Sequence, residues 1–285
     1  MKLASNCYSC IMDRAKFECD MLFSDDEKKM AAMEELLDFM VAHKKDPSPV
    51  IGTERERIMK RHSKNLDPYK EMKKESDRVA CGLLPATEEF YNRSQNKLEA
   101  LIRIAAAANS MEWGVKDHDF DNNSFGEVFQ ETLNERLDGD PKDANKYFDR
   151  FDKILYLTDN AGEVIFDLFV IEKLEKMGKR IVISPKSEPI LNDVTADELR
   201  GMTDRPIEPS GSVIGLMLEE ARPELLDILC DEDWLILAKG MGNFETITEF
   251  EDKLKGRLIY IMRAKCEPVA NRIGTQKGSL VIRAV

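Results

Sequence analysis

Short apolar runs alternate with helical segments in the second half of the chain, and this alternation constrains the fold more than any other feature. The apolar runs are residues 154–157, 180–184, 234–238, 258–262 and 279–282. Their length suits buried strands, and segments of helical periodicity separate several of them, including one predicted helix over residues 213–229. This rhythm is typical of an α/β fold with a mostly parallel sheet covered by helices on both faces.

The first half of the chain has few runs suited to strands. From residue 5 to about residue 146 it reads as helices joined by short polar connections. One helix is predicted over residues 87–112, where Thr87 precedes two glutamates and an alanine-rich stretch ends at Asn109. We therefore predict an all-helical N-terminal region, residues 1–148, followed by an α/β domain that binds metal and phosphate, residues 149–285.

Length and charge exclude several classes of protein. The chain has 285 residues, 42% of them hydrophobic, which is enough for a large core, and a formal charge of −12. This charge argues against a surface dedicated to nucleic acid or to an anionic membrane, although a local cation could capture a small anionic substrate. No apolar run approaches a membrane span, and the six cysteines are scattered, so we expect a soluble cytoplasmic protein with reduced thiols. The oligomeric state stays open.

Polar clusters follow four of the predicted strands at the end where a parallel sheet binds its ligands. In such sheets the loops beyond the carboxyl ends of the strands gather at one edge. The clusters are, in chain order, Asp159–Asn160–Ala–Gly162–Glu163, Ser184–Pro185–Lys186–Ser187 followed by Asn192–Asp193, Lys239–Gly240–Met–Gly242–Asn243–Phe–Glu245 and Arg263–Ala–Lys265–Cys266–Glu–Pro268. Four clusters in register predict a single shared site.

The first two clusters predict a metal site. Asp159, Asn160 and Asp193 offer carboxylate and amide oxygens but no thiolate or imidazole. These ligands suit magnesium or manganese, with cobalt or nickel also accommodated. Two carboxylates nearly neutralise a divalent ion and leave positions open for a phosphate and a water.

The other two clusters predict a phosphate site. Gly240 and Gly242 let main-chain amides approach a phosphate closely, with Asn243 in the same loop, while Lys239 and Lys265 could neutralise its remaining oxygens. A metal, lysines, backbone donors and a positioned water together favour phosphoryl transfer, most simply hydrolysis of a phosphate monoester. Whether water attacks directly or Asp159 first takes up the phosphoryl group stays open.

Each of these residues also has a simpler interpretation. Asp159, Asn160 and Asp193 could cap the helices that follow them, and Lys265 could pair with a surface glutamate. Glu163 and Asp167 are interpreted as helix-face residues rather than as ligands.

Two further motifs contain metal-binding residue types. Cys7–Tyr–Ser–Cys10 could hold zinc or form a redox pair, but it lacks a second pair, and Cys81 or a histidine would have to complete it in space. The alternative is two small residues at the start of a helix. Asp117–His118–Asp119 lies in a polar stretch that suits a solvated loop better than the main site.

Taken together, these motifs resemble those of the DUF89 family, the damage-control phosphatases with an ARMT1-like domain. The resemblance rests on the four strand-end clusters, on Ala107–Ala108–Asn109 and on the N-terminal CxxC, and it covers nearly the whole chain. It is strongest to the short stand-alone subfamily found largely in archaea, which carries such a CxxC.

The resemblance implies a metal-dependent phosphatase with a Rossmann-like three-layer α/β/α core, acting on surplus or harmful phosphometabolites such as sugar phosphates. Its metal ligands would be Asp159, Asn160 and Asp193. Asn109 and Lys265 would lie near the substrate. The predicted catalytic residues are therefore the two carboxylates that hold the metal, Asp159 and Asp193, together with Lys265. This chain departs from the family in the stretch after Asn109. The family often carries an Asp there, whereas this chain has Ser110–Met111–Glu112.

Two other functions remain open at this point. Some family members have been described as carboxyl methyltransferases, although this chain lacks a convincing glycine-rich loop for that cofactor. A metal-binding or nucleotide-binding module without catalysis is the other alternative.

Overall fold

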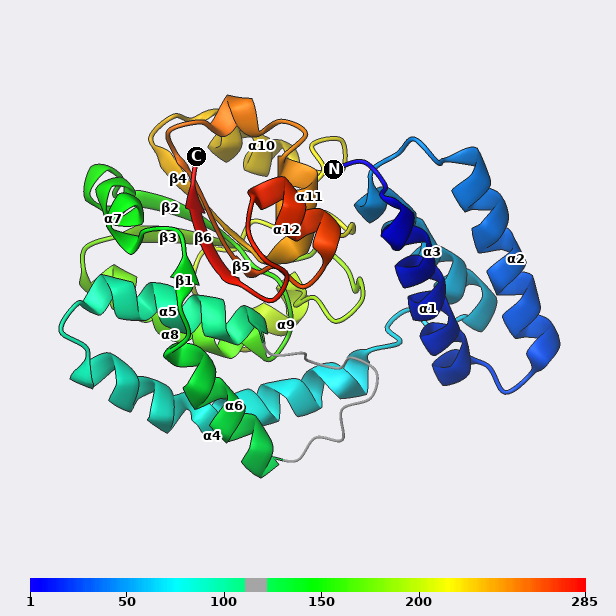
Figure 1. Cartoon of the computed structure of the whole chain (residues 1–285), viewed down its shortest axis with the longest axis horizontal. Helices are drawn as coiled ribbons and strands as arrows, with labels where there is room; N and C mark the ends of the chain where they lie inside the picture. The colour runs from blue at the N-terminus through cyan, green and yellow to red at the C-terminus, as the bar shows by residue number, and fades with distance from the viewer. Residues whose placement is uncertain (111–121) are drawn as a thin grey trace.

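The structure, a computed structural model, describes residues 1–110 and 122–285 (Figure 1). Its first helices are α1 (Ser5–Leu22), α2 (Asp26–Ala42), α3 (Ser48–Ser63), α4 (Lys70–Arg93), α5 (Lys97–Ser110) and α6 (Asn122–Leu133). Later helices are α7 (Pro141–Arg150), α8 (Glu163–Lys176), α9 (Ala196–Arg200), α10 (Pro223–Cys230), α11 (Gly240–Ile247), η1 (Glu251–Leu254) and α12 (Glu267–Ile273). The strands are β1 (Leu137–Asp138), β2 (Lys153–Leu157), β3 (Arg180–Ser184), β4 (Trp234–Lys239), β5 (Leu258–Arg263) and β6 (Leu280–Ala284).

One six-stranded sheet, in the order β1-β6-β5-β4-β2-β3, organises the second half of the chain. All its neighbours pair in parallel except β5 and β6, which are antiparallel. The five predicted apolar runs form β2, β3, β4, β5 and β6. The prediction of an α/β fold with a mostly parallel sheet is therefore confirmed.

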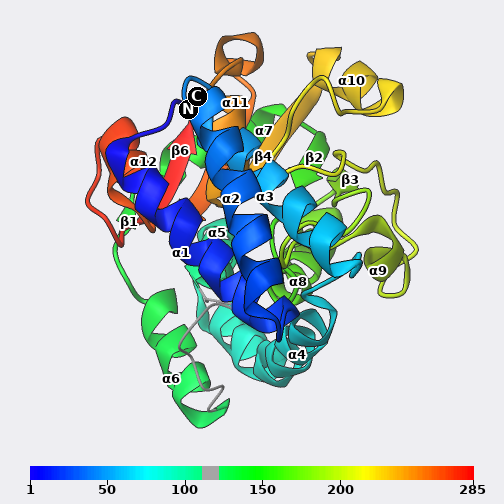
Figure 2. The same ribbon diagram turned by 90° about the vertical axis from the view of Figure 1, so that its right-hand side faces the viewer.

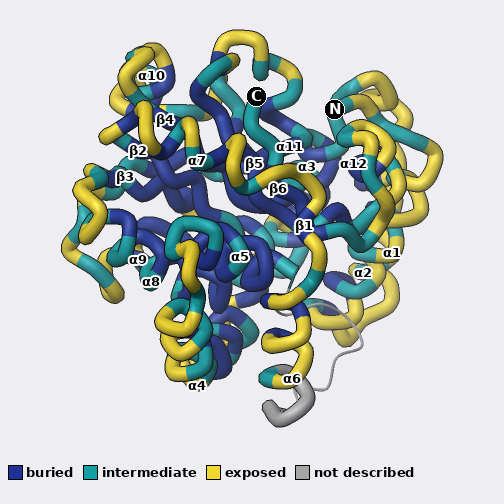
Figure 3. Tube along the Cα trace, turned by 60° about the vertical axis from the view of Figure 1, so that its left-hand side comes forward, coloured by how far each residue is buried: buried dark blue, intermediate teal, exposed yellow. Residues whose placement is uncertain are grey.

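Helices cover both faces of the sheet. Ile154 and Tyr156 of β2 pack with α5 and α8, whereas Leu155 and Leu157 pack with α10, α11 and α12. In Figure 1, α5 and α8 lie below the strands and α10 lies above them. The strands are among the most buried parts of the tube in Figure 3. Because a strand presents successive residues to opposite faces, a run that is apolar throughout requires this three-layer arrangement.

The helices α1, α2 and α3 form a unit with its own hydrophobic core, seen face-on in Figure 2. Within it, Arg55 donates two hydrogen bonds to the buried Glu18, at 2.9 and 3.0 Å, and the Tyr69 hydroxyl donates a third at 2.8 Å. A forked guanidinium matches a carboxylate in this way, so the charges of Arg55 and Glu18 are paired.

The rest of the first half packs on the sheet. Helix α5 lies against β5, and β1 extends the sheet beside β6. The helical N-terminal region is therefore present, but only α1 to α3 form a separate core. The proposed domain boundary at residue 148 stays a prediction.

Two predicted helices differ from those observed. Helix α4 continues through Thr87, whose hydroxyl donates to the Leu83 carbonyl at 2.9 Å instead of capping a new helix, and α5 begins only at Lys97. The predicted helix over residues 213–229 is helical only from Pro223, because Gly215 has a φ of 74° that a helix does not allow.

Glu112 and Asp117–His118–Asp119 lie outside the described residues. Within the described ranges, no helix is both long and apolar enough to cross a membrane.

Candidate functional site

The site lies where the strand order of the sheet reverses. After β2 the chain passes to β3 on one side and then returns to β4 on the other side of β2. The loops that follow β2 and β4 therefore leave in opposite directions, and α/β sheets bind their ligands in the crevice expected at such a position. Asp159 and Asn160 follow β2, and Lys239 ends β4 at the same crevice.

Backbone pairing brings the three predicted metal ligands together. Asn160 and Asp193 are partners in an isolated antiparallel bridge, and the Val194 amide donates to the Asp159 carbonyl at 3.1 Å. The loop after β3 thus runs directly beside the turn after β2. Asp193 is buried, whereas Asp159 and Asn160 are partly exposed at the strand ends.

Amide groups orient the Asp159 carboxylate. Its Oδ2 accepts hydrogen bonds from the Nδ2 atoms of Asn109 and Asn160, each at 2.9 Å. The same two amides also donate to the buried Glu163, at 3.0 to 3.2 Å. On its other side, Asn109 accepts the backbone N–H of Arg263 at 3.0 Å, which links the end of β5 to the end of β2.

The electrostatics of the site favour a bound cation. Burial, together with the charges of Glu163 and Asp193, raises the pKa of Asp159 well above its ordinary range, and Lys265 and Lys186 only partly oppose this. Burial also raises the pKa of Asp193, although Lys186 lies 3.7 Å away. Carboxylates held this close repel one another, and a divalent ion would relieve that repulsion.

A glycine provides space beside Asp159. Gly240 has a φ of 78°, and a Cβ atom built there would lie 2.0 Å from Asp159 Oδ2. Both the backbone conformation and the close approach require glycine at this position.

Comparisons with known proteins identify the family. Residues 3–281 match the model of the damage-control phosphatase ARMT1-like domain. The chain belongs to this family. The predicted resemblance is thereby confirmed.

Relatives in archaea span nearly the same length. An uncharacterized protein of Methanocaldococcus jannaschii is 32% identical, over 99% of this chain and 95% of its own. A damage-control phosphatase of Archaeoglobus fulgidus is 27% identical over the whole of both chains. A crystal structure of a DUF89 family protein from Pyrococcus horikoshii superposes with a TM-score of 0.86 at 25% identity, covering 100% of this chain and 99% of that one.

In this member of the ARMT1-like family, the predicted substrate-binding residues occupy different environments. Lys265 is partly exposed beside Met241, and its charge reaches Asp159. Asn109, Lys239 and Asn243 are buried and bonded within the protein; Asn243 donates to the carbonyl oxygens of Thr158 and Lys239, at 3.1 and 2.7 Å. Gly242 lies in α11 beside Gly215 rather than beside Asp159. Substrate contact by each of these residues stays a prediction.

Three site residues were missed or misinterpreted from the sequence. Glu163 and Asp167, interpreted above as helix-face residues, are fully buried and contact Lys239. Their spacing held a signal, because both lie on the stripe of α8 that also carries Val170, Ile171 and Leu174, and acids within an apolar stripe require buried partners. Lys186 belongs to the polar stretch that follows β3, but no role in the site was predicted for it from the sequence, whereas the structure places it 3.7 Å from Asp193.

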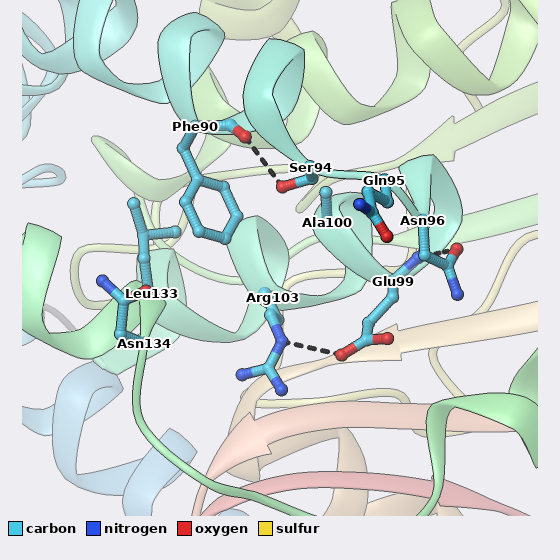
Figure 4. Close-up of a pocket in the computed structure, with 9 residues that line it drawn as sticks. All are labelled: Phe90, Ser94, Gln95, Asn96, Glu99, Ala100, Arg103, Leu133 and Asn134. Atoms are coloured by element: carbon cyan, nitrogen blue, oxygen red, sulfur yellow. Dashed lines mark hydrogen bonds and ion pairs between the residues drawn. The ribbon is translucent and has the colours of Figure 1, made fainter.

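A hollow of about 520 Å³ lies elsewhere, between α4, α5 and the end of α6 (Figure 4). It surrounds the first turns of α5, whereas Asn109 lies at the last turn, roughly 13 Å along the helix from Ala100. Arg103, which lines the hollow, already donates to Glu99 at 3.0 Å and to the Glu135 carbonyl at 2.8 Å. This hollow is therefore separate from the strand-end site.

Proposed function

We propose that this chain is a divalent-metal-dependent phosphatase that hydrolyses small phosphorylated metabolites. The observation that carries the proposal is the meeting of Asp159, Asn160 and Asp193 at the crevice where the strand order reverses. Family membership supports the reaction class, since relatives in Archaeoglobus fulgidus and Pyrococcus horikoshii bear the name damage-control phosphatase.

The residues present fit a hard divalent cation. Asp159, Asn160 and Asp193 would hold it through oxygen atoms, as magnesium and manganese prefer, and cobalt or nickel would also fit. The raised pKa of Asp159 supports this assignment, because it reflects burial together with the repulsion of Glu163 and Asp193, which Lys265 and Lys186 offset only in part. When bound, the ion would polarise a phosphate and lower the pKa of a water molecule.

The chain's own residues would then perform the remaining tasks. Lys265, which is partly exposed at the end of β5, would neutralise a phosphate oxygen, and Gly240 would let the Asp159 carboxylate lie close against the backbone after β4. Lys186 would hold Asp193 in place from its buried position. Catalysis of this kind depends on charges fixed in advance around the transferred group.

Two nucleophiles remain to be separated. A water molecule could attack the phosphate directly, or the Asp159 carboxylate could accept the phosphoryl group first. Rapid quenching with a ³²P-labelled ester would trap a labelled protein only in the second case.

A screen of phosphate esters against Mg²⁺, Mn²⁺, Co²⁺ and Ni²⁺ tests the proposal. We expect metal-dependent release of phosphate from the unaltered protein and none from Asp159→Ala. Full activity in Asp159→Ala would overturn the proposed site, and metal binding without turnover on any phosphometabolite would favour a binding module. Heat released on titration with a methyl donor would favour a carboxyl methyltransferase.

We also propose a second metal site at Cys7 and Cys10, of the kind that takes zinc. Both lie in the first turns of α1, and burial together with the charges of Glu245, Cys7 and Cys10 raises the pKa of Cys266 to about 11. Cys266 therefore lies near the other two thiols. Within residues 1–110 and 122–285, no three carboxylate, thiol or imidazole groups are gathered closely enough to hold a metal, so zinc would have to draw these thiols together.

Metal analysis tests this second site. Zinc present in the purified protein and lost in Cys7→Ser would support it, and unchanged zinc content would favour a purely structural role. All six cysteines are free thiols, which agrees with a cytoplasmic location, itself still a prediction.

A further inference from the structure

Lys239 lies beneath the candidate site and is fully buried. Its ammonium contacts the Glu163 carboxylate and lies 2.7 Å from Asp167 Oδ1. The Tyr156 hydroxyl donates to the same Asp167 oxygen at 2.6 Å. All four side chains have no exposed surface, so this ammonium is enclosed on the side of the site that faces the core.

This lysine stays charged inside the protein. Burial lowers the pKa of Lys239, but the adjacent carboxylates of Asp167 and Glu163 outweigh that effect, and its pKa ends above the ordinary value. A buried charge is tolerated when it is paired and hydrogen-bonded in this way. A lysine that binds phosphate would need an accessible ammonium, and Lys265 is partly exposed whereas Lys239 is not.

Glu163 connects Lys239 to the predicted metal ligands. One of its oxygens meets the Lys239 ammonium, and both accept the Asn109 amide, at 3.2 and 3.0 Å. The second oxygen also accepts the Asn160 amide at 3.2 Å. With every oxygen of Glu163 occupied by donors, this carboxylate acts as an anchor for amide groups rather than as a metal ligand.

The anchor determines which atom Asn160 presents to the crevice. Its Nδ2 donates to both Glu163 and Asp159, and in a planar amide the Oδ1 atom then points away from those two carboxylates. The side-chain amides of Asn109 and Asn160 also donate to Oδ2 of Asp159 and so fix that carboxylate. Partners of this kind fix the orientation of metal ligands and are as necessary as the ligands themselves.

We propose that Lys239 is a positioning residue: through Glu163 it orients Asn160 and Asp159 toward a divalent cation, and it does not touch the substrate. The proposal rests on the proposed divalent-cation site but not on phosphatase turnover, so metal binding alone can test it.

The experiment compares two lysines at neighbouring strand ends, Lys239→Met and Lys265→Met. Titration calorimetry with Mn²⁺ measures metal affinity, and steady-state kinetics on a phosphate ester at saturating Mn²⁺ measures KM. We expect Lys239→Met to bind Mn²⁺ about tenfold or more weakly with KM changed by less than about twofold. Lys265→Met should show the reverse, a raised KM with nearly unchanged Mn²⁺ affinity.

Asp167→Asn provides a second variant if Lys239→Met does not fold. It keeps the side-chain shape but removes one of the two carboxylates that hold Lys239, so Mn²⁺ affinity should fall by about threefold or more. Circular dichroism confirms that each variant is folded.

The possible outcomes separate clearly. Unchanged Mn²⁺ affinity with a raised KM in Lys239→Met would show that this lysine binds the substrate and would overturn the proposal. Tighter Mn²⁺ binding would also overturn it, because Lys239 would then act only by repelling the cation. If Lys239→Met does not fold, unchanged affinity in Asp167→Asn has the same consequence. No Mn²⁺ binding by the unaltered protein would overturn the metal site itself, whereas missing turnover with intact binding would affect only the phosphatase proposal.

Discussion

Two buried charge networks in this molecule each pair a carboxylate with a basic side chain and a tyrosine, and they differ in what surrounds them. In the N-terminal unit, Glu18 receives Arg55 and Tyr69, three donors onto one carboxylate. At the strand ends, Lys239 and Tyr156 hold Asp167 in a similar way. In each network a neighbouring carboxylate is affected, because burial and the charge of Glu18 raise the pKa of Glu56, and burial with the charges of Glu163 and Asp193 raises the pKa of Asp159. The networks differ in access, since Glu56 is fully buried whereas Asp159 is partly exposed at a strand end.

The difference separates charge used for stability from charge used for binding. A carboxylate enclosed in the core is out of reach of a ligand, whereas carboxylates that repel one another at a partly exposed strand end are held at a cost that a cation can offset. Substitutions in the N-terminal network should therefore lower the free energy of unfolding. Changes at the strand ends should affect metal binding and activity.

The largest expected effect is on activity. Asp193→Ala removes one proposed ligand, and we expect the rate of phosphate release to fall by about a thousandfold, roughly 4 kcal/mol of transition-state stabilisation. Without metal, the same change removes repulsion with Asp159 but also removes the carboxylate beside the buried Lys186. Because these two effects oppose each other, the free energy of unfolding should change little. A large loss of stability in metal-free Asp193→Ala would contradict the comparison.

The second effect is on stability. Glu18→Ala leaves Arg55 buried without its carboxylate, which should reduce the free energy of unfolding by about 3 kcal/mol or more. Urea denaturation measures this change. Calorimetry with Mn²⁺ serves as the control, since a network remote from the strand ends should leave metal affinity unchanged.

Metal itself should stabilise the protein. At a Mn²⁺ concentration one hundred times Kd, the free energy of unfolding should rise by about 2.7 kcal/mol through linkage. Thermal unfolding with and without Mn²⁺ measures the shift, and a chelator should reverse it. The shift should be retained in Glu18→Ala and absent in Asp193→Ala; the opposite pattern would place the metal elsewhere.

The smallest effects concern the two tyrosines. Tyr69→Phe and Tyr156→Phe each remove a hydrogen bond to a buried carboxylate, and each should cost about 1.5 kcal/mol of stability. Only Tyr156→Phe should also weaken Mn²⁺ binding, by about twofold, because only Tyr156 bonds to Asp167 beneath the site. Equal effects of both variants on Mn²⁺ affinity would contradict the distinction between the networks.

The sheet and the strand-end clusters could be predicted from the sequence because their signals are local. A run such as 154–157 is apolar at every position, and polar residues follow it immediately. The parallel rule then places Asp159, Asn160, Asp193 and Lys265 at one edge without any knowledge of the contacts between them.

The roles of individual side chains could not be predicted, because they depend on contacts distant in sequence. Lys239 ends one strand and Lys265 follows the next with the same charge, yet Lys239 is enclosed by Glu163 and Asp167 whereas Lys265 is partly exposed. Similarly, Thr87 has the side chain of a helix cap but lies within α4, where tertiary packing outweighs local preference.

The close approach of Gly240 to Asp159 also has an evolutionary consequence. Any side chain at position 240 would overlap the carboxylate, which Asn109 and Asn160 already hold in place. The position therefore cannot drift through intermediate residues, and its loss would remove the metal site in a single mutational step. Among related sequences, those that lack this glycine should also tolerate replacement of Asp159, so substitutions at the two positions should occur in the same sequences.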